Sequence, residues 1–224
     1  MCNDNSNFFK PADASRASRR ITLKSSVSSR GFIPNHTGNC WASYESTLER
    51  DFLTIVRALP DVKRVEEQPE PVTYVDGDGK RRKHTFDFVI YLTTGEKFAC
   101  DIKPENRLAR SGIKEVHHCI RKQRPNYADR FLVRTDRKIS RVLVRNSELI
   151  LRARNLKNEE AIGELRQHLA TMHGVFRLAA LVAHFSEEAI GFNAVLNLID
   201  LQELKPVTRG PINDDTELQI CLAA

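Results

Sequence analysis

The sequence has no run of about 18 apolar residues, which excludes a segment with the composition of a membrane-spanning helix. It begins with MCNDNSNFFKPADASRASRR, which lacks the apolar core of a secretory signal peptide, so we expect a cytoplasmic protein without a membrane partner. Its five cysteines are an odd number without a Cys-x-x-Cys pair, which favours reduced thiols over a disulfide scaffold. The pattern of a nucleotide-binding P-loop is also missing, so any use of ATP belongs to a partner.

Positive charge is present instead, and it is unevenly distributed. The chain of 224 residues has a net charge of +6, and residues 1–40 hold six Lys or Arg against two Asp. A second basic stretch, KRRKH, occupies residues 80–84. Basic side chains on arms and loops suit contacts with nucleic-acid phosphates, and an ordinary solvated surface is the alternative. We predict that DNA phosphates are bound by Lys80, Arg81, Arg82 and Lys83.

Periodicity and turn residues divide the chain into three parts. Residues 1–40 are rich in Ser, Asn and Arg, which predicts a basic, mostly irregular arm. Residues 41–140 predict a compact α/β domain with a helix from Tyr44 to Pro60, followed by further strands and one more helix. The later strands are expected near residues 86–92, 97–103 and 130–136, and the later helix near 110–125.

The remaining part, residues 141–224, has a different pattern. Three helical stretches are expected at residues 158–174, 175–185 and 186–204, and two short extended pieces follow them. Three helices followed by a short ribbon are the order of a winged helix-turn-helix. We therefore predict a winged-helix-like domain at the C-terminal end.

The candidate chemistry lies where the two central strands meet at one end. Asp101 and Lys103 are two residues apart on a strand and so project from one face, and Asp87 opens the neighbouring strand. The upstream helix offers Glu45 and Glu49, one turn apart. Carboxylates within about 4 Å of one another repel by roughly 1–4 kcal/mol per pair unless a cation compensates them. This pattern is typical of a Mg²⁺ site in a phosphodiester hydrolase, with Lys103 orienting the attacking water, although a structural ion pair also explains Asp-x-Lys.

Other chemistry is less well supported by the residues. His117-His118-Cys119 suggests zinc, but adjacent histidines on a helix point to different sides and no second ligand pair lies at finger spacing. We interpret this stretch as helix surface with one buried thiol. Cys100 next to Asp101 is expected to face away from the site, because neighbours on a strand alternate.

Five stretches follow one another in a fixed order over roughly residues 40–140: Ser46 to Glu49, Glu67-Gln68-Pro69, Thr85 to Phe88, Asp101 to Pro104 and Thr135-Asp136. In this order they resemble the motifs of the TnsA endonuclease subunit of heteromeric bacterial transposases. Two positions differ from the family pattern: Phe86 stands where proline is usual, and Asp101 replaces a longer Glu or Gln.

The resemblance implies a fold and a set of roles. The fold is a restriction-endonuclease-like mixed-sheet core with a PD-(D/E)xK type site, followed by the winged-helix-like domain. Glu49, Asp87 and Asp101 would bind Mg²⁺, for which Mn²⁺ can substitute, and Lys103 would be the catalytic lysine. Gln68 would support the site. Glu45 is the rival acid, but the S-x-x-E match favours Glu49.

The resemblance also implies a function. TnsA-type subunits cut the 5′ strands at transposon ends, which the DDE-type partner transposase TnsB does not join to the target. The C-terminal region is expected to contact the AAA+ regulator TnsC and DNA, in a bacterial, nucleoid-associated setting. Two alternatives stay open: a catalytically inactive DNA-binding or scaffolding subunit, and a free-standing restriction or repair nuclease.

Overall fold

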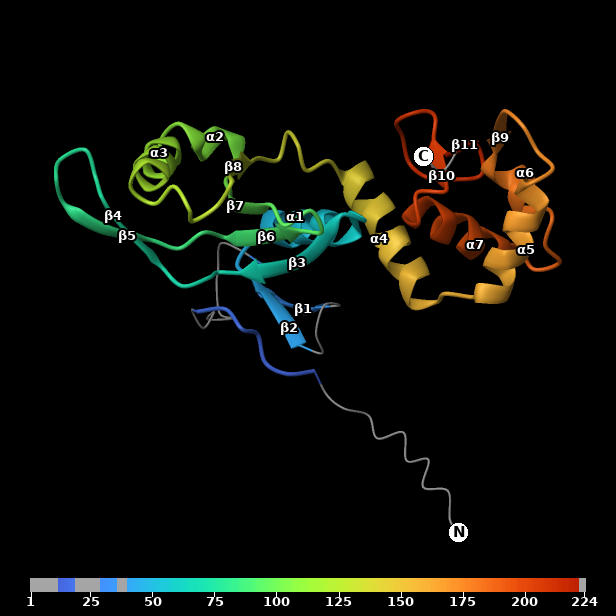
Figure 1. Cartoon of the computed structure of the whole chain (residues 1–224), viewed down its shortest axis with the longest axis horizontal. Helices are drawn as coiled ribbons and strands as arrows, with labels where there is room; N and C mark the ends of the chain where they lie inside the picture. The colour runs from blue at the N-terminus through green and yellow to red at the C-terminus, as the bar shows by residue number, and fades with distance from the viewer. Residues whose placement is uncertain (1–11, 19–28, 36–39, 222–224) are drawn as a thin grey trace, which may run out of the picture. The chain divides into compact units, whose positions relative to one another are not determined.

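The computed structural model describes residues 12–18, 29–35 and 40–221, and four of the basic residues of the N-terminal arm, Lys10, Arg19, Arg20 and Lys24, lie outside them (Figure 1). The chain forms two compact units, one of residues 1–50 and 63–133 and the other of 51–62 and 134–224. Each unit combines helices and strands, so the predicted α/β class is confirmed at that level. In the described part of the chain, no helix is long and apolar enough to cross a membrane.

A four-stranded sheet forms the centre of the first unit. Its order is β3-β6-β7-β8, and the strands span Val62–Glu67, Phe88–Leu92, Lys97–Ile102 and Arg130–Arg134. β6 and β7 are an antiparallel hairpin in which Phe88 pairs with Cys100. Consecutive residues of both strands are buried, which means that both faces of this hairpin are covered. The two predicted strands are thus present, and the first begins two residues later than expected.

Two further hairpins belong to the first unit. β1 (Gly31–Asn35) pairs with β2 (Cys40–Tyr44), so part of the segment expected to be mostly irregular is a strand. β4 (Val72–Val75) pairs with β5 (Arg81–His84). The β4–β5 hairpin carries the basic stretch and leads directly to Asp87.

Among the described residues of the first unit, one helix precedes the four-stranded sheet in the sequence, and two lie between β7 and β8. α1 (Thr47–Ala58) begins in this unit and continues into the second, α2 spans Glu105–Leu108, and α3 spans Ile113–Gln123. Gln123 at the end of α3 joins the β4–β5 hairpin, because its Oε1 accepts the Val75 N–H at 2.8 Å and its Nε2 donates to the Val75 carbonyl at 2.7 Å. This side chain acts as a strand partner for an otherwise open edge.

The second unit contains a helix that the sequence patterns did not predict. α4 spans Arg141–Asn155 and begins after Ser140, whose side chain accepts the Leu143 N–H. Near its end, Arg154 donates to both carboxylate oxygens of Asp200 at 2.7 and 2.6 Å, and to the carbonyls of Arg57 and Ala58 at 2.7 and 3.1 Å. Burial, and then the charge of Arg154, lower the pKa of the Arg57 guanidinium to about 10.

The remaining elements follow the predicted order with shorter bounds. The expected middle helix is instead a strand followed by a short helix, because its first residues pair with the C-terminal ribbon. An antiparallel sheet of order β10-β11-β9 results, and the buried apolar side chains of this unit lie under it and the helices. The elements are α5 (Glu159–Leu169), β9 (Val175–Arg177), α6 (Leu178–Val182), α7 (Glu188–Asp200), β10 (Leu204–Pro206) and β11 (Glu217–Ile220).

Candidate active site

Asp87 and Lys103 meet at the end of the β6–β7 hairpin. Continuing the strand register by one position places Asp87 opposite Asp101. Asp87 Oδ2 accepts the Ile102 N–H at 2.7 Å and lies 3.3 Å from Lys103 Nζ. The sequence motif therefore brings an acid and an amine together at a point where the chain holds the acid by its backbone.

Glu49 reaches this region from the first turn of α1. Its Oε1 accepts the Ser46 hydroxyl at 2.9 Å, its Oε2 accepts the Glu45 N–H at 2.8 Å, and Ser46 Oγ accepts the Glu49 N–H. This is a capping-box arrangement, so the S-x-x-E motif has a local role at the helix start. The rival Glu45 contributes its backbone N–H to Glu49. The charge of Glu49 also acts on Asp87 and Lys103.

The charges of these groups act on one another. Burial raises the pKa of Asp87 to about 6, and the nearby charges of Asp101 and Glu49 add to the rise while Lys103 opposes it. Burial alone would lower the pKa of Lys103, but the charges of Asp87, Asp101 and Glu49 outweigh it and hold the pKa above its usual value. The four predicted residues are thus one electrostatic group with an excess of negative charge.

Asp101 faces two histidines that no sequence pattern related to the site. Its Oδ2 lies 2.9 Å from His84 Nε2 and 2.7 Å from His117 Nε2. Burial raises the pKa of Asp101, but the hydrogen bonds from His117 and then His84 outweigh it, so the pKa is lowered. The other oxygen, Oδ1, is buried and has no hydrogen-bond partner in the described part of the chain.

His117 lies in the interior, in contrast to the helix surface predicted for His117-His118-Cys119. Adjacent side chains do point to different sides, since His118 is exposed, but His117 is buried at 4% exposure and contacts Asp101. It is therefore not helix surface. His84 was assigned only to the basic stretch, yet it ends β5 next to the site. The three residues lie on β5, β7 and α3, and only their placement in the fold relates them.

Phe86, at the position where the TnsA-type sequence pattern has proline, is fully buried. Its ring stacks on Tyr127 at a centroid distance of 5.3 Å and lies 4.7 Å from His84 and 5.4 Å from His117. Phe131 completes this aromatic cluster. The side chain at position 86 thus packs directly against both imidazoles.

Gln68 lies beside Asp87 through its backbone. Its N–H donates to the Asp87 carbonyl at 3.0 Å, and it has a positive φ of 40°. Its side chain is buried, and Oε1 has no hydrogen-bond partner among the described residues. The structure therefore places the expected supporting residue next to the acid.

The basic stretch is exposed along the β4–β5 hairpin. All four side chains from Lys80 to Lys83 are exposed, but Arg82 Nε donates to Asp76 Oδ2 at 2.9 Å. The other three are available to a polyanion, whereas Arg82 must first leave Asp76.

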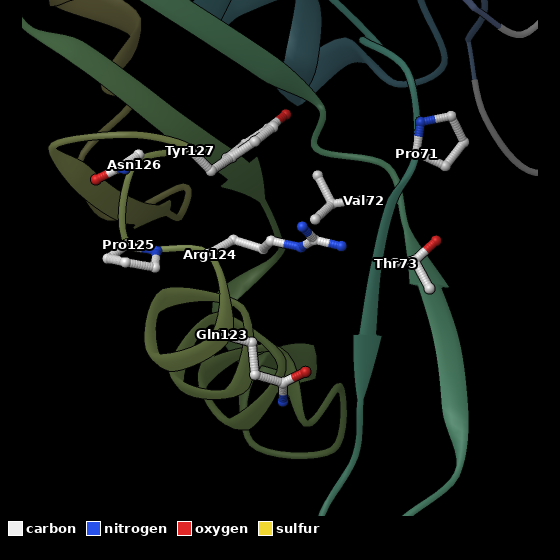
Figure 2. A pocket seen from close by; sticks show the side chains of 8 residues that line it. All are labelled: Pro71, Val72, Thr73, Gln123, Arg124, Pro125, Asn126 and Tyr127. Carbon is white, nitrogen blue, oxygen red and sulfur yellow. The ribbon is translucent and has the colours of Figure 1, made fainter.

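A pocket of about 580 Å³ lies between β4 and the segment that follows α3 (Figure 2). In Figure 2 the Arg124 side chain crosses it toward Val72. It contains none of the predicted metal ligands, so it is separate from the carboxylates. Its lining residues are Pro71, Val72, Thr73, Gln123, Arg124, Pro125, Asn126 and Tyr127.

Comparisons of the chain with models of known protein families and with curated proteins find no match. The resemblance to TnsA-type endonucleases therefore rests on the sequence motifs.

Proposed function

We propose that this chain is a metal-dependent DNA endonuclease subunit of the TnsA type, which cleaves the 5′ strands at transposon ends. The observation that carries the proposal is the contact of Asp87 with Lys103, at 3.3 Å, inside a group that also contains Asp101 and Glu49. An isolated structural ion pair would need only one acid. Here three acids share the neighbourhood of Lys103, and the pKa of Asp87 is raised despite that contact.

The three predicted acids offer oxygen ligands for a divalent cation, although among the described residues these oxygens do not all lie within 4.8 Å of one another. Asp101 Oδ1 is buried without a partner, which costs about 1–3 kcal/mol unless a ligand satisfies it. Oxygen ligands from Glu49, Asp87 and Asp101 suit Mg²⁺ or Mn²⁺. When bound, the ion supplies charge neutralisation and an activated water for phosphodiester hydrolysis.

The chain's own groups have separate tasks in this proposal. The Ile102 N–H fixes the orientation of Asp87, and the Ser46 hydroxyl fixes that of Glu49. Lys103, half-buried and cationic, orients a water or a phosphate oxygen beside Asp87. Gln68 holds the Asp87 carbonyl and thereby the start of β6.

The fold supports the finer assignment. The β6–β7 hairpin, which has Asp87, Asp101 and Lys103 at one end and α3 after it in the sequence, supports a restriction-endonuclease-like core. The order α5, β9, α6, α7, β10, β11 supports a winged-helix-like second unit. In the proposed setting, DNA ends, the DDE-type transposase TnsB and the AAA+ regulator TnsC are the partners.

The test is cleavage of a labelled transposon end by the purified chain together with its partner transposase. We expect cutting that requires Mg²⁺ or Mn²⁺ and that Asp87→Ala reduces at least about a hundredfold. Asp78→Ala, an exposed aspartate on the β4–β5 turn, is the matched control and should cut normally. Equal cutting by Asp87→Ala and wild type would eliminate the proposed site.

One observation favours a second candidate, a nuclease-like DNA-binding subunit without activity. Asp101 already directs Oδ2 to two histidines, so this oxygen is not free for an ion beside Asp87. Binding of DNA without cutting, at any divalent ion tried, would support this function. Cutting without any partner would instead indicate a free-standing nuclease.

A further inference from the structure

Three ligand atoms of the kind that bind transition metals converge inside the first unit. A nitrogen of His84, a nitrogen of His117 and a carboxylate oxygen of Asp101 all lie within 4.8 Å of one another. The two nitrogen–oxygen distances are 2.9 and 2.7 Å. Ligands about 2.0–2.2 Å from one ion are about 3 Å apart, so the spacing already resembles one side of a coordination shell.

The hydrogen bonds of the two histidines leave one oxygen of Asp101 without a partner among the described residues. Both histidines direct Nε2 to the same oxygen of Asp101, while Oδ1 is buried and has no partner among the described residues. The Asp101 side chain is only 1% exposed, so bulk water does not satisfy it. A buried polar atom without a partner marks a position where an ion or an ordered ligand belongs, and an ion that binds this carboxylate through both oxygens would satisfy Oδ1.

The surroundings resemble those of a metal site. Phe86 packs against both imidazoles, and Phe131 lies 6.0 Å from the His117 ring. Such a shell limits the rotation of the rings and excludes water, which strengthens metal–ligand bonds. The ligands come from three separate elements, β5, β7 and α3, so they are held in place by the fold.

We propose that His84, Asp101 and His117 bind a divalent first-row transition ion, such as Zn²⁺, Co²⁺ or Mn²⁺. Two imidazoles and one carboxylate suit these ions, whereas Mg²⁺ and Ca²⁺ prefer oxygen alone. Each Nε2 must offer its lone pair, which requires the ring proton on Nδ1. Three protein ligands leave at least one position for water or a phosphate oxygen. The site shares Asp101 with the proposed nuclease group but does not depend on that function.

The experiment is a titration of the full chain, freed of metal by a chelator, with Co²⁺ as an optical probe. We expect one ion per chain with visible absorption, displaced by Zn²⁺ and not by millimolar Mg²⁺. His84→Gln and His117→Gln should each weaken binding at least about tenfold. His84 is the less buried of the two, so its variant tests the proposal even where the His117 variant does not fold.

Two control variants distinguish this site from other histidines. His118→Gln changes the exposed neighbour on α3, and His168→Gln changes a ring that stacks on His184 in the second unit at 4.1 Å. Both should bind Co²⁺ like wild type. The absence of stoichiometric binding, or full binding by a folded His84→Gln variant, would overturn the proposal.

A parallel comparison separates this proposal from the proposed function. Asp87→Ala should stop DNA cleavage and keep Co²⁺ binding, because Asp87 is not one of the three ligands. Co²⁺ binding in a chain that never cuts DNA supports the metal site alone. Cutting by a chain that binds no Co²⁺ supports the nuclease alone and overturns the metal site.

Discussion

At the scale of single residues, Asp87 makes the stability of the protein depend on pH. Its pKa of about 6 is above the usual 3.8. Above pH 6 the folded chain therefore contains a buried carboxylate whose charge destabilises it relative to the unfolded chain. The free energy of unfolding should therefore rise as the pH falls from about 7 to 4. Without metal, Asp87→Asn should be more stable than wild type by about 2–3 kcal/mol at pH 8, with no difference near pH 4.

Chemical denaturation at the two pH values measures this effect. Asp78→Asn, at an exposed position, is the control and should show no pH-dependent gain. Mg²⁺ at a hundredfold excess over its dissociation constant should stabilise wild type by about 2.7 kcal/mol, and Asp87→Asn much less. A loss of stability in Asp87→Asn at pH 8 would mean that its contacts with Lys103 and Ile102 outweigh the burial of charge.

Lys103 offers a prediction about activity. Lys103→Met keeps most of the side-chain volume and removes the amine 3.3 Å from Asp87. We expect cleavage to fall at least about a hundredfold while DNA affinity changes less than about threefold. Lys114→Met on α3 is an exposed control. Cleavage and DNA affinity falling together would assign Lys103 to DNA binding.

The sequence supported the acids and the lysine but not the histidines, for a physical reason. Asp101 and Lys103 are neighbours on one strand, and Asp87 opens the strand that pairs with it, so alternation and pairing relate them. His84 and His117 approach Asp101 only after β5 and α3 have packed. The S-x-x-E stretch that relates Glu49 to the site is also a common motif of a helix start, and Ser46 and Glu49 have that role here.

At the scale of elements, the β4–β5 hairpin should bind DNA through its charge. Arg81 and Lys83 are exposed and alternate with Arg82, which Asp76 holds at 2.9 Å. We expect the double variant Arg81→Gln and Lys83→Gln to make the slope of log DNA affinity against log salt concentration shallower by about one to two, which corresponds to one to two lost phosphate contacts. Arg82→Gln should have a smaller effect, because binding DNA must first break its pair with Asp76. Fluorescence anisotropy at several salt concentrations measures both, and an unchanged slope would exclude the hairpin.

Helices and strands with regularly spaced apolar residues were predicted from the sequence. Elements that form by pairing with a segment far along the chain were not. The β6–β7 hairpin carries its own turn and its own buried runs, so its bounds were close. Residues 175–185 have a helical period, yet Val175–Arg177 are a strand because β11 pairs with them. α4, a 15-residue helix, was not predicted, and its buried face is interrupted by the polar Ser147.

At the scale of the whole molecule, Arg154 links three segments of the second unit. Its guanidinium donates to the Asp200 carboxylate on α7 and to the last two carbonyls of α1. Arg154→Ala should destabilise the protein by about 3 kcal/mol, because Asp200 and two carbonyls lose their partner. Arg152→Ala, exposed two residues earlier, is the control and should change stability by less than about 0.5 kcal/mol. Thermal unfolding measures the difference, and similar values for both would contradict the role of Arg154.

The ring of Phe86 has a consequence for how this chain can evolve. Phe86→Pro would leave a void among His84, His117, Tyr127 and Phe131, at a cost of about 3–5 kcal/mol. Such a loss takes up much of the stability of an ordinary domain, so compensating changes in the neighbouring rings would have to come first. A change at position 86 is therefore expected only together with changes among these aromatic neighbours.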